Sequence, residues 1–214
     1  MKNNYLALRV AIAFSAGLSA MPFNALADAG LYDAPIPADK SLVRFVNVKL
    51  KSGVALDFSG QKFDLEPVAL SNYKLIGNGD YTITDGQAST TATLEPGKYY
   101  TVAAGGDSIV VIADKEVENP SKSALTLYNF SSAPADLALK LNGQSKELFA
   151  DVAPSTMASK ELPVIDIGFA VSEGDKTVSE VEKVSLTAKE RQNVVVVDTP
   201  NGPASYLIAT GIDQ

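Results

Sequence analysis

Two halves of the chain share one pattern of apolar, polar and turn residues, and this internal repeat limits the folds open to it. Residues 42–47 alternate apolar and polar positions as a half-buried strand does, and residues 124–129 repeat the alternation at an offset of 82. Further matches follow in order: Val54, Leu56 and Phe58 align with Leu137, Leu139 and Leu141, and residues 99–103 align with 193–197. Because the match persists along successive segments, we interpret it as a tandem duplication.

Each copy has the pattern of short strands separated by tight turns. Asn-Gly or Asp-Gly pairs occur at residues 78–79, 85–86, 142–143 and 201–202. Such pairs supply the positive φ that a tight hairpin requires. This spacing of strands and turns predicts an all-β chain of two tandem antiparallel β-sandwich domains, immunoglobulin-like in general form. The predicted boundaries are 42–114 for the first domain, 115–123 for a polar linker and 124–214 for the second domain.

The first 27 residues have the features of a secretory signal peptide. Lys2 and Arg9 make the start positive, residues 10–20 are apolar, and Ala-Leu-Ala at 25–27 has the small-residue form that precedes cleavage. We expect cleavage there, leaving an extended arm over 28–41 and no transmembrane segment. Cleavage removes two cations and no acid, so the formal charge of −7 becomes −9. A chain this acidic is not expected to bind nucleic acid.

The composition removes most catalytic chemistry. The chain contains no His, Cys or Trp. There is therefore no Ser-His-Asp or Cys-His nucleophile pair, and no ordinary zinc, copper, haem or iron–sulfur ligand set. Carboxylate catalysis, Ser-Lys catalysis and oxygen-ligated cations remain open, although no loop has the acidic spacing of a calcium site. We predict a protein that is not an enzyme and has no metal or cofactor.

Three sets of polar residues are candidates for catalysis. Gly-Asp-Ser at 106–108 has the form of the segment that carries the nucleophile in SGNH hydrolases and O-acetyltransferases, but no His is present to accept the serine proton. A hairpin turn explains the same residues. The pairs Asp80/Asp85 and Glu180/Glu182 would suit a glycosidase only if an apolar pocket raised one pKa. These acids lie at turns or alternate with apolar residues, so we interpret them as solvated and predict no catalytic residue.

One segment of this acidic chain is basic. Lys40, Arg44, Lys49 and Lys51 occur before the first acid that follows them, Asp57. One interpretation is a contact with an acidic partner or an anionic polysaccharide through short-range charge pairing. The other is that these are ordinary outward strand residues that protect a sheet edge from aggregation.

Several short motifs occur in a fixed order along the mature chain. They are Leu-Tyr-Asp-Ala-Pro at 31–35, Ser-Leu-Val-Arg-Phe-Val-Asn at 41–47, the segment 75–83, Lys-Tyr-Tyr-Thr-Val at 98–102 and Lys-Ser-Ala-Leu-Thr-Leu-Tyr-Asn at 122–129. In this order, together with the signal peptide and the two β domains, the chain resembles the alginate biosynthesis protein AlgF family, whose members are periplasmic factors for alginate O-acetylation.

The resemblance implies a non-catalytic periplasmic accessory protein. It would bridge the periplasmic and inner-membrane O-acetyltransferase proteins, and direct binding of alginate is left open. We predict partner contacts at Leu31 and Tyr32 of the arm and at Arg44, Lys49 and Lys51 of the basic segment. The alternative is an exported carbohydrate-binding or adhesion module with tandem Ig-like domains. Such modules present aromatic platforms to sugars, whereas most Tyr and Phe here lie within alternating strands.

Overall fold

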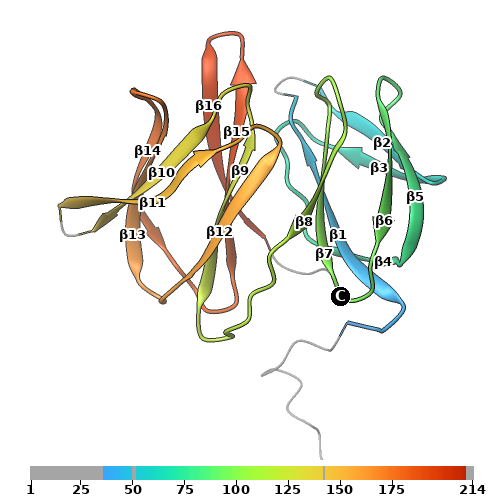
Figure 1. Cartoon of the computed structure of the whole chain (residues 1–214), viewed down its shortest axis with the longest axis horizontal. Coiled ribbons are helices and arrows are strands. Elements are labelled where there is room, and N and C mark those ends of the chain that lie inside the picture. The colour runs from blue at the N-terminus through green and yellow to red at the C-terminus, as the bar shows by residue number, and fades with distance from the viewer. Residues whose placement is uncertain (1–35, 50–51, 142, 211–214) are drawn as a thin grey trace, which may run out of the picture. The chain divides into compact units, whose positions relative to one another are not determined.

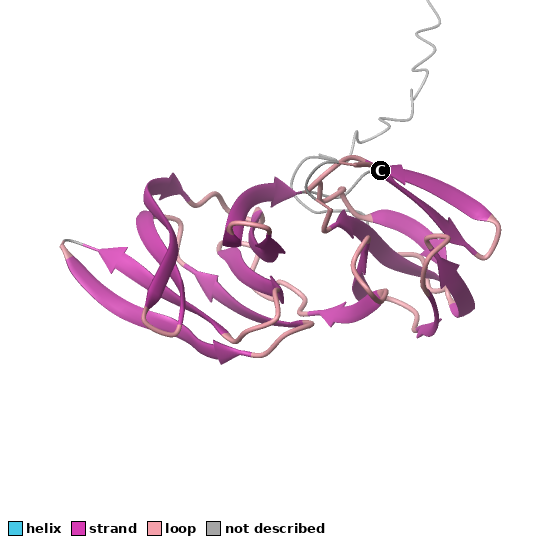
Figure 2. Ribbon diagram, turned by 90° about the horizontal axis from the view of Figure 1, so that it is seen from above, coloured by secondary structure: helices cyan, strands magenta, loops and turns pink. Residues whose placement is uncertain are grey.

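The computed structural model describes residues 36–49, 52–141 and 143–210. The predicted signal peptide, residues 1–27, and residues 28–35 of the predicted arm lie outside the described residues. The described part contains strands, turns and loops and no helix, as Figure 2 shows by colour. Within these ranges there is accordingly no helix with the length and apolar character needed to cross a membrane.

Eight strands form each repeat, and Figure 1 labels them along the chain. The first repeat contains β1 (Lys40–Asn47), β2 (Val54–Phe58), β3 (Gln61–Leu65), β4 (Lys74–Gly77), β5 (Gly79–Thr84), β6 (Ser89–Leu94), β7 (Tyr99–Ala104) and β8 (Val110–Asp114). The second contains β9 (Ser123–Phe130), β10 (Ala135–Leu141), β11 (Gln144–Val152), β12 (Thr156–Leu162), β13 (Asp166–Glu173), β14 (Lys176–Ser185), β15 (Arg191–Thr199) and β16 (Gly202–Thr210).

The strand order confirms the two repeated all-β domains. The first repeat forms the sheets β4-β1-β7-β8 and β3-β2-β5-β6, and the second forms β12-β9-β15-β16 and β11-β10-β13-β14. Adding eight to each strand number of the first repeat gives the order of the second. We call β4-β1-β7-β8 and β12-β9-β15-β16 the inner sheets and the other two the outer sheets.

Pairing within the sheets is antiparallel with one exception in each repeat. β1 and β7 pair in parallel, and so do β9 and β15. The prediction of antiparallel sheets was based on hairpin turns, and a hairpin joins two strands that are adjacent in sequence. β1 and β7 are instead separated by strands of both sheets, and this connection is long enough to return the chain in the same direction.

Two asparagines show how the copies superpose. Asn47 Nδ2 donates to the carbonyls of Ser52 at 3.0 Å and Leu65 at 3.1 Å. Asn129 Nδ2 makes the same pair of bonds, to Ala133 at 2.7 Å and Val152 at 2.8 Å. Each side chain therefore joins its inner strand to the outer-sheet segments that follow. The offset of 82 between the two asparagines, predicted from the sequence, is confirmed.

The same bonds correct the alignment further along. Leu65 and Val152 are equivalent, because each accepts a hydrogen bond from the asparagine of its own repeat. Leu65 pairs with Val54, and Val152 pairs with Ala135. Val54 therefore corresponds to Ala135 and not to Leu137. The alignment of 99–103 with 193–197 is also displaced by two, because β1 pairs Leu42 with Tyr99 and β9 pairs Ala124 with Arg191. A shift of two residues leaves every side chain on the same face of its strand, so the apolar pattern alone did not detect it.

Each sandwich has its own core, and a third apolar cluster lies between the two inner sheets. One core contains Val43, Phe45, Leu56 and Phe58, and another contains Leu125, Leu127, Leu137 and Phe169. The third contains Val46, Ala103 and Ile112 of the first repeat with Tyr128, Val195 and Val197 of the second. The inner strands β1, β7, β9 and β15 are consequently buried on both faces along nearly their whole length.

We expect Asn47→Ala and Asn129→Ala to lower the free energy of unfolding by about 1–3 kcal/mol each, because each change leaves buried backbone groups without a partner. Urea unfolding followed by circular dichroism measures this. The exposed Gln144→Ala serves as the control and should lie within about 0.5 kcal/mol of wild type. Wild-type stability in both asparagine variants would contradict the proposed role of these side chains.

Candidate functional site

A buried cluster of hydrogen-bonded polar side chains lies between the two inner sheets. At its centre is Arg44 of β1, whose side chain is 1% exposed. Its Nε donates to Thr101 Oγ1 at 2.9 Å and its Nη1 to Thr210 Oγ1 at 2.7 Å. Its Nη2 donates to Tyr128 OH at 2.5 Å and to Asn193 Oδ1 at 3.0 Å. Three of these four acceptors belong to the second repeat, so the guanidinium joins the two sandwiches.

Asp114, the last residue of β8, balances the charge. Its carboxylate is 3.8 Å from Arg44 Nε, and its side chain is 2% exposed. Three hydroxyls donate to it: Tyr73 at 2.8 Å, Thr101 at 2.5 Å and Tyr128 at 2.6 Å. Among the described residues, no buried side-chain nitrogen or oxygen lacks a hydrogen-bond partner. This completeness makes a buried ion pair tolerable, because an unpaired buried charge is strongly destabilising.

Aromatic rings enclose the guanidinium. The Arg44 Cζ lies 4.4 Å from the ring centroid of Tyr73 and 5.2 Å from that of Tyr128. A second arginine, Arg191, lies 4.8 Å from the ring of Tyr99 and donates to the carbonyl of Lys115 at 3.0 Å. Cation–π contacts of this kind gain strength when water is excluded. They hold both arginines at the junction of the repeats and fix the start of the linker.

The cluster is not suited to proton transfer near neutral pH. Burial would lower the pKa of Arg44, but the surrounding Tyr128, Tyr73 and Asp114 raise it above its usual value, so the guanidinium stays charged. Burial raises the pKa of Tyr73 and of Tyr128, and although Arg44 opposes this, Asp114 adds to it. Both phenols therefore remain protonated. The arrangement acts as a clamp between domains.

The repeat explains where the partners of Arg44 come from. By the pairing of the inner strands, Thr101 of the first repeat corresponds to Asn193 of the second, and Asp114 corresponds to Thr210. The first copy thus contributes the charges and the second contributes neutral groups at matching positions. Arg44 itself corresponds to Thr126, which is also buried. Polar residues at matching positions of both copies are typical of exposed strand faces too, so this match did not reveal a second buried face.

The prediction that Arg44 lies on the outer surface is wrong. Alternation along β1 correctly places it on the face opposite the domain core, but the second sandwich covers that face. Lys49 is partly exposed, and its Nζ donates to Gln87 Oε1 at 3.2 Å. Lys51, Leu31 and Tyr32 lie outside the described residues. The structure therefore does not bring a continuous basic surface together, and partner binding through Lys49 stays a prediction.

Asp80, Asp85 and Glu180, three of the acids considered as candidates, have local partners. Asp80 Oδ1 accepts from Thr93 at 2.6 Å, and Asp85 accepts from the backbone NH groups of residues 87 and 88 at its turn. Although burial opposes it, these bonds lower the pKa of Asp85. Lys140 lowers the pKa of Glu180 through a hydrogen bond and its charge. A depressed pKa is the opposite of what a general acid requires. In the described ranges, no three acids gather as a metal site would require.

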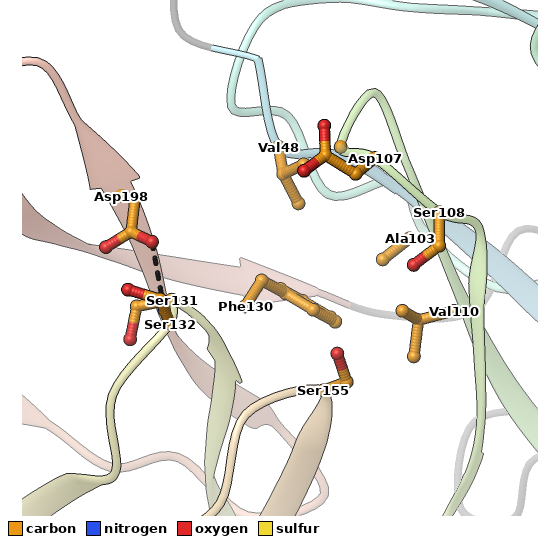
Figure 3. Close-up of a pocket in the computed structure, with 11 residues that line it drawn as sticks. Val48, Ala103, Asp107, Ser108, Val110, Phe130, Ser131, Ser132, Ser155 and Asp198 are labelled. Carbon is orange, nitrogen blue, oxygen red and sulfur yellow. Dashed lines mark hydrogen bonds between the residues drawn. The ribbon is translucent and has the colours of Figure 1, made fainter. Parts of the chain in front are cut away.

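A cleft opens beside the cluster, where the inner strands end. Its smaller part has a volume of about 200 Å³ and contains Phe130 with Asp107 on one side and Asp198 on the other (Figure 3). A neighbouring part of about 530 Å³ adds Lys49. The Gly-Asp-Ser segment 106–108 lies on the rim. Gly105 leads into it with a φ of +94°, and a Cβ there would lie only 2.9 Å from Asn47 Oδ1, so only glycine lets this turn pack so closely.

We expect Arg44→Met to lower the free energy of unfolding by about 3–5 kcal/mol, because it leaves Asp114 buried without its countercharge. Adding Asp114→Asn should restore part of the loss, so the double variant is more stable than the two single effects predict. Urea unfolding of the four proteins gives the coupling. The exposed pair Asp166–Lys183, changed in the same way (Lys183→Met, Asp166→Asn), is the control and should leave the unfolding midpoint unchanged. If the losses of unfolding free energy in the two single variants simply add in the double variant, Arg44 and Asp114 are not coupled, and this would contradict their role in joining the domains.

The buried phenols predict a loss of stability in alkali. Their pKa values in the folded chain lie above the unfolded value of about 10, so folding binds protons more tightly. The associated stability is complete below about pH 10 and falls as the pH rises further. Ring-carbon NMR of Tyr73 and Tyr128 should show ionisation only together with loss of the folded spectrum. Ionisation of either ring in a protein that is still folded would contradict the assignment.

The chain was compared with known proteins. The family model described as "Alginate O-acetyl transferase AlgF" matches residues 13–196. The chain is 30% identical to the alginate biosynthesis protein AlgF of Pseudomonas aeruginosa over 184 residues, covering 85% of this chain and 83% of that protein. It is 24% identical to the AlgF of Azotobacter vinelandii over 201 residues, covering 94% and 92%.

Solved structures give lower overall similarity. The C-terminal domain of AlgF from P. aeruginosa matches 42% of this chain and 98% of its own length, with 22% identity and a TM-score of 0.36. A putative cell adhesion protein from Bacteroides ovatus matches 83% and 99%, with 10% identity and a TM-score of 0.30. The family match extends over most of the sequence. The chain therefore belongs to the AlgF family of alginate biosynthesis proteins.

Proposed function

We propose that this protein is a non-catalytic periplasmic adaptor for the O-acetylation of alginate, which positions the acetyl-transferring proteins relative to one another. Membership of the AlgF family supplies the pathway. The observation that best supports the adaptor role is the Arg44 cluster, because its charged and hydroxyl groups bond to one another and join the two sandwiches. Such a joint gives a body of fixed geometry on which two partners can be held.

An acetyl-transfer role for the protein itself finds little support in the cleft. Serine catalysis needs a base beside the hydroxyl and donors for the developing oxyanion. Ser108 lies on the exposed rim, and no histidine exists in the chain to accept its proton. Ser131 is buried, and its hydroxyl is held by Asn129 Oδ1 at 2.7 Å and Glu173 Oε1 at 2.6 Å. These contacts are those of a structural turn.

The adaptor proposal predicts specific protein partners. The tagged mature chain, used to capture proteins from the periplasmic and inner-membrane fractions of its own cells, should recover an alginate O-acetyltransferase or its membrane acetyl-donating protein. In cells lacking the gene, the acetyl content of alginate should fall, and wild type and Ser108→Ala should restore it equally. The outcome against the proposal is clear: a folded Ser108→Ala protein that binds the partners but does not restore acetylation would indicate catalysis.

A further inference from the structure

The cleft has a defined place in the fold. Val48 follows β1, Gly106 follows β7, Phe130 ends β9 and Asp198 lies near the end of β15. The two parallel pairs of inner strands thus bring four strand ends to one opening. The walls come from both repeats, so the opening exists only when the two sandwiches are joined.

The floor of the cleft is the uncovered end of the inter-sandwich core. Val48, Val110 and Phe130 pack against that core but remain partly exposed. The Phe130 ring lies 6.1 Å from the Tyr128 ring at an angle of 13°, so the aromatic stack begins in the Arg44 cluster and ends at the cleft. A partly exposed aromatic ring beside a cavity is a surface on which a flat or cationic group can rest.

The charge around this floor is negative. Asp107 and Asp198 come from opposite repeats, and both are exposed. The Asp198 carboxylate accepts only a backbone NH, that of Ser132 at 2.9 Å, and neither acid has an ion pair within the described ranges. A third acid, Glu173, accepts a hydrogen bond from the hydroxyl of Ser131, which lines the cleft. Among the residues that the structure describes, Lys49 is the cation that lines the cleft, in its larger part, where its Nζ donates to Gln87 Oε1.

We propose that this cleft is a docking site for an arginine side chain presented by a partner protein. The proposal rests on the adaptor function and names the chemistry of its contact. The two carboxylates complement a guanidinium, whose planar donors suit carboxylates, and the Phe130 ring offers a cation–π contact. The smaller part of the cleft, about 200 Å³, is below the size of pockets that hold whole small molecules, and one long side chain matches the size of this part. An anionic uronate polymer would instead meet two like charges at the entrance.

A titration with N-acetyl-arginine amide tests the chemistry directly. Added to the isotope-labelled mature chain, it should shift the NMR signals of Gly106, Phe130 and Asp198 in a saturable way, less strongly at high salt. N-acetyl-glutamate amide should not. Asp107→Asn combined with Asp198→Asn should weaken binding about tenfold. The matched control, Asp64→Asn combined with Asp175→Asn, removes two exposed acids elsewhere and should change binding less than about twofold.

Shifts that do not saturate, that map elsewhere, or that persist in the Asp107/Asp198 variant would overturn the proposal. Phe130→Leu keeps the apolar floor but removes the ring, and it should also weaken binding while the rest of the spectrum is retained. Capture of the O-acetylation proteins tests the docking site and the adaptor function separately. If wild type and the Asp107/Asp198 variant capture them equally, docking lies elsewhere and the adaptor function stands. If wild type captures none, the adaptor function fails and with it the partner assigned to the cleft.

Discussion

The ion pair of Arg44 and Asp114 is the interaction on which the arrangement of the two repeats depends. Each sandwich has an apolar core of its own, so burial of that core stabilises each pair of sheets separately. The second face of the two inner sheets carries an apolar cluster, this ion pair with its hydroxyl and amide partners, and Arg191. Burying that face removes the charges of Arg44 and Asp114 from water, which is tolerable because no buried side-chain nitrogen or oxygen of the described residues lacks a hydrogen-bond partner. The cluster therefore selects one relative position of the sandwiches among many that apolar packing alone would permit.

The internal repeat also shows which parts of the fold could be predicted from the sequence. Strand alternation and turn residues predicted two β-sandwich domains, and the pair Asn47 and Asn129 gave the correct offset. The alignment failed by two residues beyond β1 because a two-residue shift preserves the inward face of a strand. The parallel pairs were missed because they join strands distant in sequence, for which no local signal exists. Arg44 was misplaced for a related reason: alternation identifies two faces of a strand but not whether a second domain covers the polar one.

The candidate site was predictable only in part. The segment 106–108 was singled out from its resemblance to a nucleophile motif, and the structure places it on the rim of a cleft. Asp198 and Phe130 gave no signal, since an acid near the end of a strand and an aromatic at a strand end are common surface features. Their importance appears only when the fold brings four strand ends together. A long-range arrangement of this kind, built from both copies of a duplicated domain, gives the two halves a shared feature that neither has alone.

We expect the Arg44 cluster to make one folding unit of the two repeats. Native-state hydrogen exchange, read at the amides of β1 and β7 in one repeat and β9 and β15 in the other, measures this most directly. We expect the amides of all four strands to exchange through one opening with a common free energy. We also expect Arg44→Met to separate them into two groups. Separate free energies for the two repeats in the wild-type protein would contradict the account, since each sandwich would then open without regard to the other.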